Sequence, residues 1–219
     1  MTAPIPPGTS APGTDHIIVL ASGRGTRAGG PKALHKIGNE LWWQSQARRL
    51  ARAGMPVRWV VSETVARSMD GHDIQRVPGD DSAPMFASII AGIESIDSDA
   101  LHRTREPQVV RGVFILPVDV PAPQPATFRR LSDAMAASQT LSAAIPVHAG
   151  KHGHPIYLPW RFVRQRLLGR AHSPDGRLDR MIEGSRLEVP VDDPGVLLNL
   201  NTAADFAALP ASEWGLTRP

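Results

Sequence analysis

The sequence contains no cysteine among its 219 residues. A disulfide framework, a thiolate zinc site and a cysteine nucleophile are therefore excluded, and the chain is compatible with a reducing compartment. It also has no run of about 18 apolar residues, which excludes a membrane-spanning helix. Basic residues number 24 and acidic residues 21, and the two are well mixed. Composition therefore gives no reason to expect nucleic acid as a partner.

Residues 1–14 are almost all Pro, Gly, Ala, Ser and Thr. They lack the basic start and apolar run of a secretory signal, so we expect a disordered tail and a cytoplasmic protein. The apolar fraction of 42% is ordinary for a chain with a sizeable core. We expect residues 15–219 to form a single domain.

Short β-branched runs alternate with segments of helical apolar spacing. Residues 16–21 form such a run and lead into glycines, which is typical of a buried strand feeding a turn. The same reasoning predicts further strands at 57–61, 74–77, 113–116, 141–146, 155–158, 187–191 and 196–200, helices at 41–53, 63–69, 84–96, 127–137, 160–168 and from 203, and a polar surface loop at 97–109. This alternation predicts a Rossmann-like, three-layer α/β sandwich with a mostly parallel sheet, in which ligands bind beyond the carboxyl ends of the strands.

A glycine-rich loop, residues 20–32, follows the first predicted strand directly. Its glycines let backbone N–H groups approach a polyphosphate without a Cβ in the way. Arg27 would grip two phosphate oxygens with its fork, while Lys32 would act as a mobile point charge. The alternative is an ordinary glycine-rich turn with solvated basic side chains. The spacing matches neither a Walker A motif nor a GxGxxG dinucleotide fingerprint.

The loop resembles the Leu-Ala-Ala-Gly-x-Gly-x-Arg-Met-Gly-x-x-Lys signature of nucleotidyltransferases, with Ser22 for the third-position Ala and Ala28 for Met. Segments 84–92, 116–121, 148–155 and 192–206 resemble further motifs of the MobA-like NTP transferases, in particular the molybdenum cofactor cytidylyltransferases. Together these segments span nearly the whole chain. The resemblance implies the fold of the nucleotide-diphospho-sugar transferases.

The resemblance also implies a role for particular residues. Arg27, Lys32 and Asp119 would be catalytic, and Gly153, His154 and Pro155 would lie toward the acceptor substrate. The implied nucleotide-binding residues are Leu20, Ala21, Ser22, Gly23, Gly25, Thr26, Arg27, Lys32 and Ser88.

Mg²⁺ is the implied metal, held by Asp119 and Asn201. Here the chain departs from the pattern, because Asn199 and Asn201 stand where cytidylyltransferases usually carry aspartates, although the guanylyltransferase branch commonly has Asn at both positions. An amide oxygen is a weaker Mg²⁺ ligand than a carboxylate. Asp119 is therefore expected to be the main protein ligand of the metal.

The implied reaction is transfer of a nucleotidyl group from a nucleoside triphosphate to a phosphorylated acceptor of the molybdopterin type, with release of pyrophosphate. In this family Gly at the position of Ser22 is associated with guanine and Ala with cytosine, so the side chain of Ser22 favours CTP over GTP. A recipient molybdoenzyme is a further expected partner. Two alternatives stay open: a sugar-phosphate nucleotidyltransferase, because Gly25-Thr26-Arg27 recurs in that branch, and a non-catalytic nucleotide or cofactor carrier, because of Asn199 and Asn201.

Overall fold

The computed structural model describes residues 13–102, 109–138, 143–169 and 176–209. The strands are β1 (Thr14–Ala21), β2 (Lys36–Ile37), β3 (Glu40–Leu41), β4 (Val57–Val61), β5 (Arg76–Pro78), β6 (Val110–Pro117), β7 (Ala144–His148), β8 (Lys151–His152), β9 (Ile156–Pro159) and β10 (Leu187–Pro190). The α-helices are α1 (Trp42–Ala51), α2 (Glu63–Ser68), α3 (Met85–His102), α4 (Pro125–Ala137), α5 (Trp160–Arg166), α6 (Leu178–Ile182) and α7 (Ala203–Ala207). Short 3₁₀ helices are η1 (Thr26–Ala28), η2 (Lys32–Leu34) and η3 (Pro194–Leu197).

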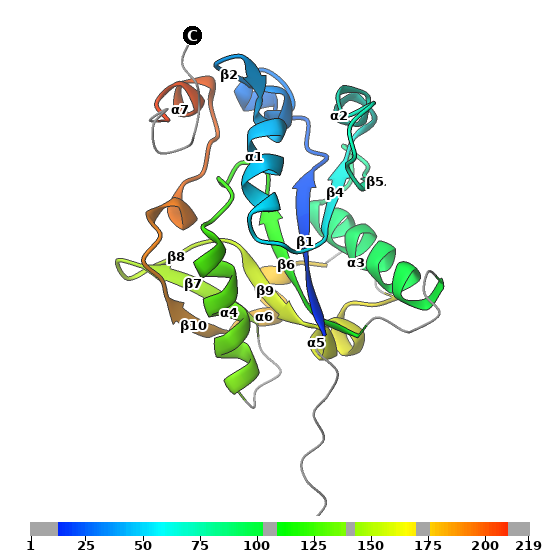
Figure 1. The fold of residues 1–219 in the computed structure, drawn as a ribbon, viewed down its shortest axis with the longest axis vertical. Helices are drawn as coiled ribbons and strands as arrows, with labels where there is room; N and C mark the ends of the chain where they lie inside the picture. Colours follow the sequence, from blue (N-terminus) through cyan, green and yellow to red (C-terminus); the bar gives the residue numbers. More distant parts are fainter. Residues whose placement is uncertain (1–12, 103–108, 139–142, 170–175, 210–219) are drawn as a thin grey trace, which may run out of the picture.

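An eight-stranded sheet organises the described residues, with strand order β10-β7-β9-β6-β1-β4-β5 and β8 paired to β7, and β2 and β3 form a separate two-stranded sheet (Figure 1). β1 lies between β6 and β4 and runs parallel to both. β9 and β8 are the antiparallel members of this sheet. The predicted Rossmann-like, mostly parallel α/β architecture is confirmed.

Two apolar cores cover the two faces of the sheet, because successive strand residues point to opposite sides. On β1, Ile17 and Val19 face one core, which includes residues of α1, α2 and α4. Ile18 and Leu20 face the other, which includes residues of α3, α5 and α6. Figure 1 shows α1 and α4 lying over the same face. No helix in the described ranges combines the length and the apolar character that crossing a bilayer requires.

Two sequence-based expectations are wrong. The stretch 97–109 was expected to be a loop, but α3 continues to His102, because Ile93, Ile96 and Ala100 extend the apolar face of the helix onto its core. Residues 103–108 of that stretch lie outside the described residues. The stretch 196–200 was expected to be a strand, but η3 occupies Pro194–Leu197. Pro194 has a fixed φ that suits the start of a helical turn, and the Asp193 side chain accepts a hydrogen bond from the N–H of Gly195.

The predicted boundaries elsewhere differ by a few residues, and some short elements were not expected. Residues 1–12 of the predicted tail, and residues 141 and 142 of a predicted strand, lie outside the described residues, while Thr14 opens β1 instead of ending the tail. The elements that the sequence did not indicate are the β2–β3 hairpin, β8, α6 and the 3₁₀ turns. All are short, so no periodicity could develop within them.

His16 on β1 is a buried titratable group away from the glycine-rich loop. It is 5% exposed, and neither ring nitrogen has a hydrogen-bond partner among the described residues. Burial, with a further contribution from the charge of Arg58, lowers the pKa of His16 from 6.5 to about 4. Arg58 itself donates a hydrogen bond to Asp99 at 2.6 Å. The fold therefore holds His16 in its neutral form.

The stability of the protein should consequently depend on pH through His16. Between about pH 6.5 and 4 the unfolded chain binds more protons at this site than the folded chain does, so stability is complete above this window and falls as the pH falls through it. The slope from one group is at most about 1.4 kcal/mol per pH unit. Urea unfolding of His16→Phe should show a flatter pH dependence than the wild type. His72→Gln, at an exposed histidine, is the control, and an unchanged slope in His16→Phe would contradict the prediction.

Candidate functional site

The loop between β1 and η1 lies at the carboxyl end of the central strand and depends on Gly25. This residue has a left-handed conformation with φ of 59°. Its carbonyl oxygen accepts hydrogen bonds from the N–H groups of Ala28 at 2.8 Å and Gly30 at 3.1 Å. A Cβ at Gly25 would lie 2.0 Å from the carbonyl oxygen of Gly30. Only glycine fits both the conformation and the space.

Helix α3 packs closely against β1, and this contact places the start of the helix beside the loop. A Cβ at Gly92 would lie 2.6 Å from Cγ2 of Ile18, so glycine lets the helix approach β1. Ser88, one turn before Gly92, then meets Ser22, and their hydroxyl oxygens are 2.8 Å apart in a buried hydrogen bond. The two segments that carry the first two motifs are therefore in direct contact.

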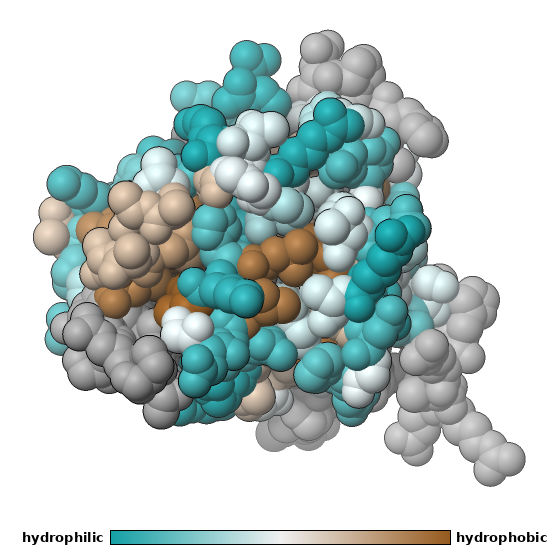
Figure 2. Space-filling model, turned by 90° about the horizontal axis from the view of Figure 1, so that it is seen from above, coloured by the Kyte–Doolittle hydropathy of each residue, from teal (hydrophilic) through white to brown (hydrophobic). Residues whose placement is uncertain are grey.

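A cavity of about 300 Å³ opens between the loop, the start of α3 and the end of β6. Figure 2, which looks onto this end of the molecule, shows hydrophobic residues near the centre of a largely hydrophilic face. The predicted residues that line the cavity are Leu20, Ser22, Gly23, Gly25, Thr26, Arg27, Lys32, Ser88 and Asp119. Ala21 points to the opposite face of β1 and packs in the core there.

Sequence reasoning missed one wall of this cavity. Asp80, Asp81, Ala83 and Met85 also line it. Asp81 accepts a hydrogen bond from Arg24 at 3.1 Å, which links this wall to the glycine-rich loop. A signal was available, because these residues follow a predicted parallel strand and must therefore emerge at the same edge of the sheet.

Lys32 joins Asp119 to Asn201. Its ammonium group donates hydrogen bonds to Asp119 Oδ2 at 2.6 Å and to Asn201 Oδ1 at 2.8 Å. Asp119 follows β6, and Asn201 precedes α7. Both the Lys32 and the Asp119 side chains are largely withdrawn from solvent, with exposures of 16% and 20%, so the water that would screen this ion pair is reduced.

The amino-terminal end of α7 fixes Asn201. The Asp205 carboxylate accepts hydrogen bonds from the N–H groups of Thr202 at 2.7 Å and Asn201 at 2.8 Å. These backbone donors, Thr202 first, lower the pKa of Asp205. The Asn201 amide nitrogen donates to the carbonyl oxygen of Asn199 at 3.3 Å, which leaves the amide oxygen facing Lys32.

The oxygen atoms of Asp119 and Asn201 form a donor set that suits a hard cation. Both lie within hydrogen-bond distance of the same lysine nitrogen, so they converge on one point. Among the described residues no cluster of three or more His, Cys, Asp or Glu side chains could hold a metal ion. A divalent ion at Asp119 and Asn201 would therefore complete its coordination with water and substrate phosphates, as Mg²⁺ commonly does.

The segment Gly153-His154-Pro155 lies outside the cavity lining, but His154 is near enough to Asp119 for the charge of that carboxylate to act on it. A Cβ at Gly153 would lie 2.4 Å from the carbonyl oxygen of Val196, and the His154 N–H donates to that same oxygen at 3.0 Å. Burial lowers the pKa of the His154 imidazole, and the charge of Asp119 acts in the opposite direction. Its Nδ1 has no hydrogen-bond partner among the described residues. Burial therefore favours the neutral form of the imidazole.

A model of the MobA-like NTP transferase domain matches residues 17–189. The chain belongs to the MobA-like NTP transferase family. A search of curated proteins finds no match to this NTP transferase.

Solved structures of other proteins share the fold of this NTP transferase. Rv0371c from Mycobacterium tuberculosis is 23% identical, with a TM-score of 0.64 over 90% of this chain and 97% of that chain, and a second structure of it is a complex with manganese. A nucleotidyl transferase from Methanothermobacter is 20% identical, with a TM-score of 0.66 over 92% and 97% of the two chains. A CMP:2-keto-3-deoxy-manno-octonic acid synthetase complexed with CTP is 12% identical, with a TM-score of 0.62 over 91% and 98%.

The geometry of the glycine-rich loop predicts different tolerance to alanine at Gly25 and Gly23. Gly25→Ala would place a left-handed alanine against the Gly30 carbonyl, at a cost of about 1–2 kcal/mol from the backbone alone. A Cβ at Gly23 would meet nothing within 4 Å, so Gly23→Ala should change stability by less than about 0.5 kcal/mol. Urea unfolding of the two variants checks this difference, and equal losses at the two positions would contradict it.

Proposed function

We propose that this NTP transferase moves a nucleotidyl group from CTP, in preference to GTP, to the terminal phosphate of a molybdopterin-type acceptor in the cytoplasm and releases pyrophosphate. One observation carries the proposal: Lys32, Asp119 and Asn201 meet at the edge of a cavity that the glycine-rich loop encloses. A cation beside oxygen ligands is the grouping that binding of a metal-bound triphosphate would require.

Different protein groups would bind the phosphates and the metal of the triphosphate complex. Backbone N–H groups of the loop, with Arg27 and Lys32, would bind the β- and γ-phosphates. Asp119 and Asn201 would hold Mg²⁺, which when bound neutralises negative charge on the triphosphate and on the departing pyrophosphate. Lys32 would exchange its contact with Asp119 for one with phosphate, because the oxygen atoms it now contacts are the proposed metal ligands.

The proposed reaction does not require the protein to remove a proton from the acceptor. An oxygen of the acceptor phosphate forms a new bond to the α-phosphorus, and the bond between that phosphorus and the α–β bridging oxygen breaks. The attacking phosphate is already anionic at neutral pH, so no strong general base is needed. Positioning and charge neutralisation would supply the rate enhancement, with Arg27 and Lys32 stabilising the pyrophosphate as it leaves.

The acceptor would enter beside His154. His154 is half-buried, and it lies near enough to Asp119 for the charge of that carboxylate to act on its imidazole. The proposal therefore places the acceptor phosphate between His154 and the nucleotide, with Gly153 and Pro155 shaping the approach. A recipient molybdoenzyme would then take the nucleotide-bearing cofactor.

Removing the Asp119 carboxylate should abolish most turnover. In an assay of pyrophosphate release with CTP, Mg²⁺ and molybdopterin, Asp119→Ala is expected to lower kcat at least about 100-fold, because the main protein ligand for the metal is lost. Asp192→Ala, at an exposed carboxylate, is the control. Wild-type rates in Asp119→Ala would contradict the proposal.

The same assay separates the acceptor classes. Release with molybdopterin but not with a panel of sugar 1-phosphates supports the proposed acceptor, whereas the reverse result identifies a sugar-phosphate nucleotidyltransferase. Tight nucleotide binding without release under either condition identifies a non-catalytic carrier.

Base preference is expected to depend on the volume at Ser22. This side chain lines the cavity, so its volume limits the room for a base. Ser22→Gly should raise kcat/KM for GTP relative to CTP by about tenfold, a typical gain for relieving one small steric conflict. Ser88→Ala, which loses the hydrogen bond but keeps the side chain of Ser22, should leave the ratio nearly unchanged. A wild-type preference for GTP, or equal turnover of both nucleotides, would disprove the assignment.

A further inference from the structure

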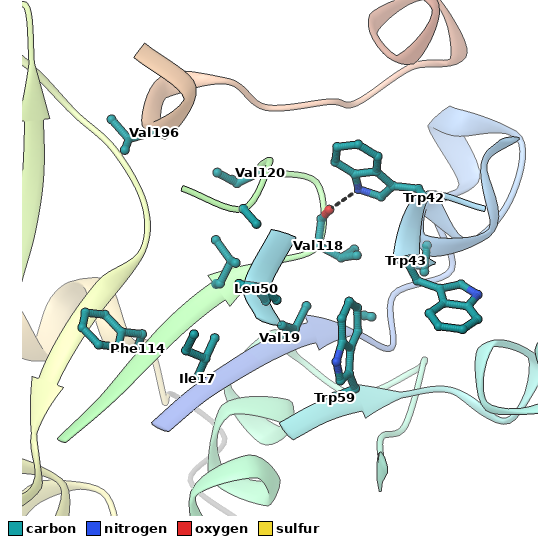
Figure 3. Close-up of a cluster of buried hydrophobic side chains, with 14 of the residues drawn as sticks. Ile17, Val19, Trp42, Trp43, Leu50, Trp59, Phe114, Val118, Val120 and Val196 are labelled. Atoms are coloured by element: carbon teal, nitrogen blue, oxygen red, sulfur yellow. Dashed lines mark hydrogen bonds between the residues drawn. The ribbon is translucent and has the colours of Figure 1, made fainter. Parts of the chain in front are cut away.

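Helix α1 holds the loop that carries Asp119. Trp42 Nε1 donates a hydrogen bond to the carbonyl oxygen of Val118 at 2.6 Å, as Figure 3 shows. Gln46, one turn further along, donates to the carbonyl oxygen of Val120 at 2.7 Å and accepts from the N–H of Ala122 at 2.7 Å. The residues on both sides of Asp119 are thus anchored to one face of a single helix.

The backbone hydrogen bonds of the Asp119 loop to β1 and to Leu200 do not replace the hydrogen bonds from Trp42 and Gln46. The Val118 N–H donates to Leu20 on β1 at 3.0 Å, and the carbonyl oxygen of Asp119 accepts from the N–H of Leu200 at 2.8 Å. These bonds fix one side of the loop. The carbonyl oxygens of Val118 and Val120 face α1 instead, and without Trp42 and Gln46 they would be buried acceptors lacking their present donors. Such groups are costly to leave unpaired, so the loop would shift to regain partners.

The two adjacent tryptophans of α1 differ in this respect. Trp42 and Trp43 are both buried, with exposures of 0% and 2%, and both belong to the core on the α1 face of the sheet. The indole N–H of Trp42 contacts the Asp119 loop, whereas that of Trp43 has no hydrogen-bond partner among the described residues. In Figure 3 only the Trp42 indole carries a dashed contact to Val118. Packing alone explains Trp43 but not Trp42.

We propose that Trp42 and Gln46 are positioning residues that act through the backbone of Val118 and Val120 to aim the Asp119 carboxylate at the nucleotide cavity. The inference rests on the proposed function, in which Asp119 holds the metal. A residue anchored on both sides has few backbone rotations left, so the carboxylate is preorganised and its ordering costs little when the substrate binds. Neither Trp42 nor Gln46 lines the cavity, and neither is assigned contact with substrate.

Paired single substitutions on α1 test the inference. Trp42→Phe keeps an aromatic ring but removes the nearer of the two donors to the Val118 carbonyl oxygen, leaving only the Gln46 amide, which lies 3.4 Å away. Trp43→Phe is the matched control, because it removes an N–H that has no partner among the described residues. Gln46→Met is the second variant, and Ser45→Ala is its control, because the Ser45 hydroxyl is buried without a partner among the described residues. The second pair decides the question if Trp42→Phe does not fold.

Two measurements separate positioning from general destabilisation. Hydrogen–deuterium exchange of the peptide covering residues 117–122, in the protein without nucleotide, should become about tenfold faster in Trp42→Phe and Gln46→Met. In turnover assays the same variants should lower kcat about tenfold and raise the half-saturating Mg²⁺ concentration about fivefold, with a smaller change in KM for CTP. The controls should stay within about twofold of wild type in both experiments.

The two hypotheses fail in different ways. If Trp42→Phe and Trp43→Phe show the same exchange over residues 117–122, the positioning role is overturned even when the wild type turns over. If the wild type releases no pyrophosphate but Trp42→Phe alone accelerates exchange, the loop is held as proposed and the proposed function is wrong. If exchange accelerates while kcat and the Mg²⁺ requirement stay at wild-type values, Asp119 is anchored but the anchoring does not serve turnover, and the inference is overturned.

Discussion

The contact of one ammonium group with two oxygen atoms organises the end of the molecule at which the glycine-rich loop lies. Lys32 meets Asp119, which is 87 positions away in the sequence, and Asn201, which is 169 positions away. It therefore joins the turn after β1, the loop after β6 and the segment before α7. A buried charge of either sign is unfavourable alone, so each of the three segments depends on the others for a stable position. The site is assembled by the tertiary fold and not by any single motif.

Glycines allow the backbone segments around the Lys32 contact to approach one another closely. Gly25 shapes the turn that presents Lys32, and Gly92 lets α3 reach β1 so that Ser88 meets Ser22. Gly153 allows a close approach to the backbone of Val196, beside His154, whose imidazole is within reach of the charge of Asp119. These glycines stand where a side chain would separate two segments of backbone. Their lack of a Cβ thus determines how closely these backbone segments approach one another.

Much of this could be predicted from the sequence, and the failures have identifiable causes. The strand at Val57–Val61 and the mostly parallel sheet follow from apolar runs and their spacing. The end of α3 was predicted as a loop because its residues are largely polar, which obscures the apolar face of the helix. The turn at η3 was predicted as a strand because the apolar run from Val196 was given more weight than Pro194 and the capping Asp193 before it. Side-chain pairing across the fold, such as Trp42 with the Val118 carbonyl, leaves no local pattern at all. Motifs predicted which residues gather, and only the structure shows through which contacts.

The amide at Asn201 is consistent with the charge balance around Lys32. With Asn201, the single positive charge of Lys32 meets the single negative charge of Asp119, and the three groups together are neutral. A second carboxylate at this position would lie beside Asp119 with only one cation shared between them, and like charges at close range raise each other's pKa. An amide oxygen keeps the hydrogen bond to Lys32 without that repulsion. Under the proposed function, the negative charge of a triphosphate would draw Lys32 away from Asp119.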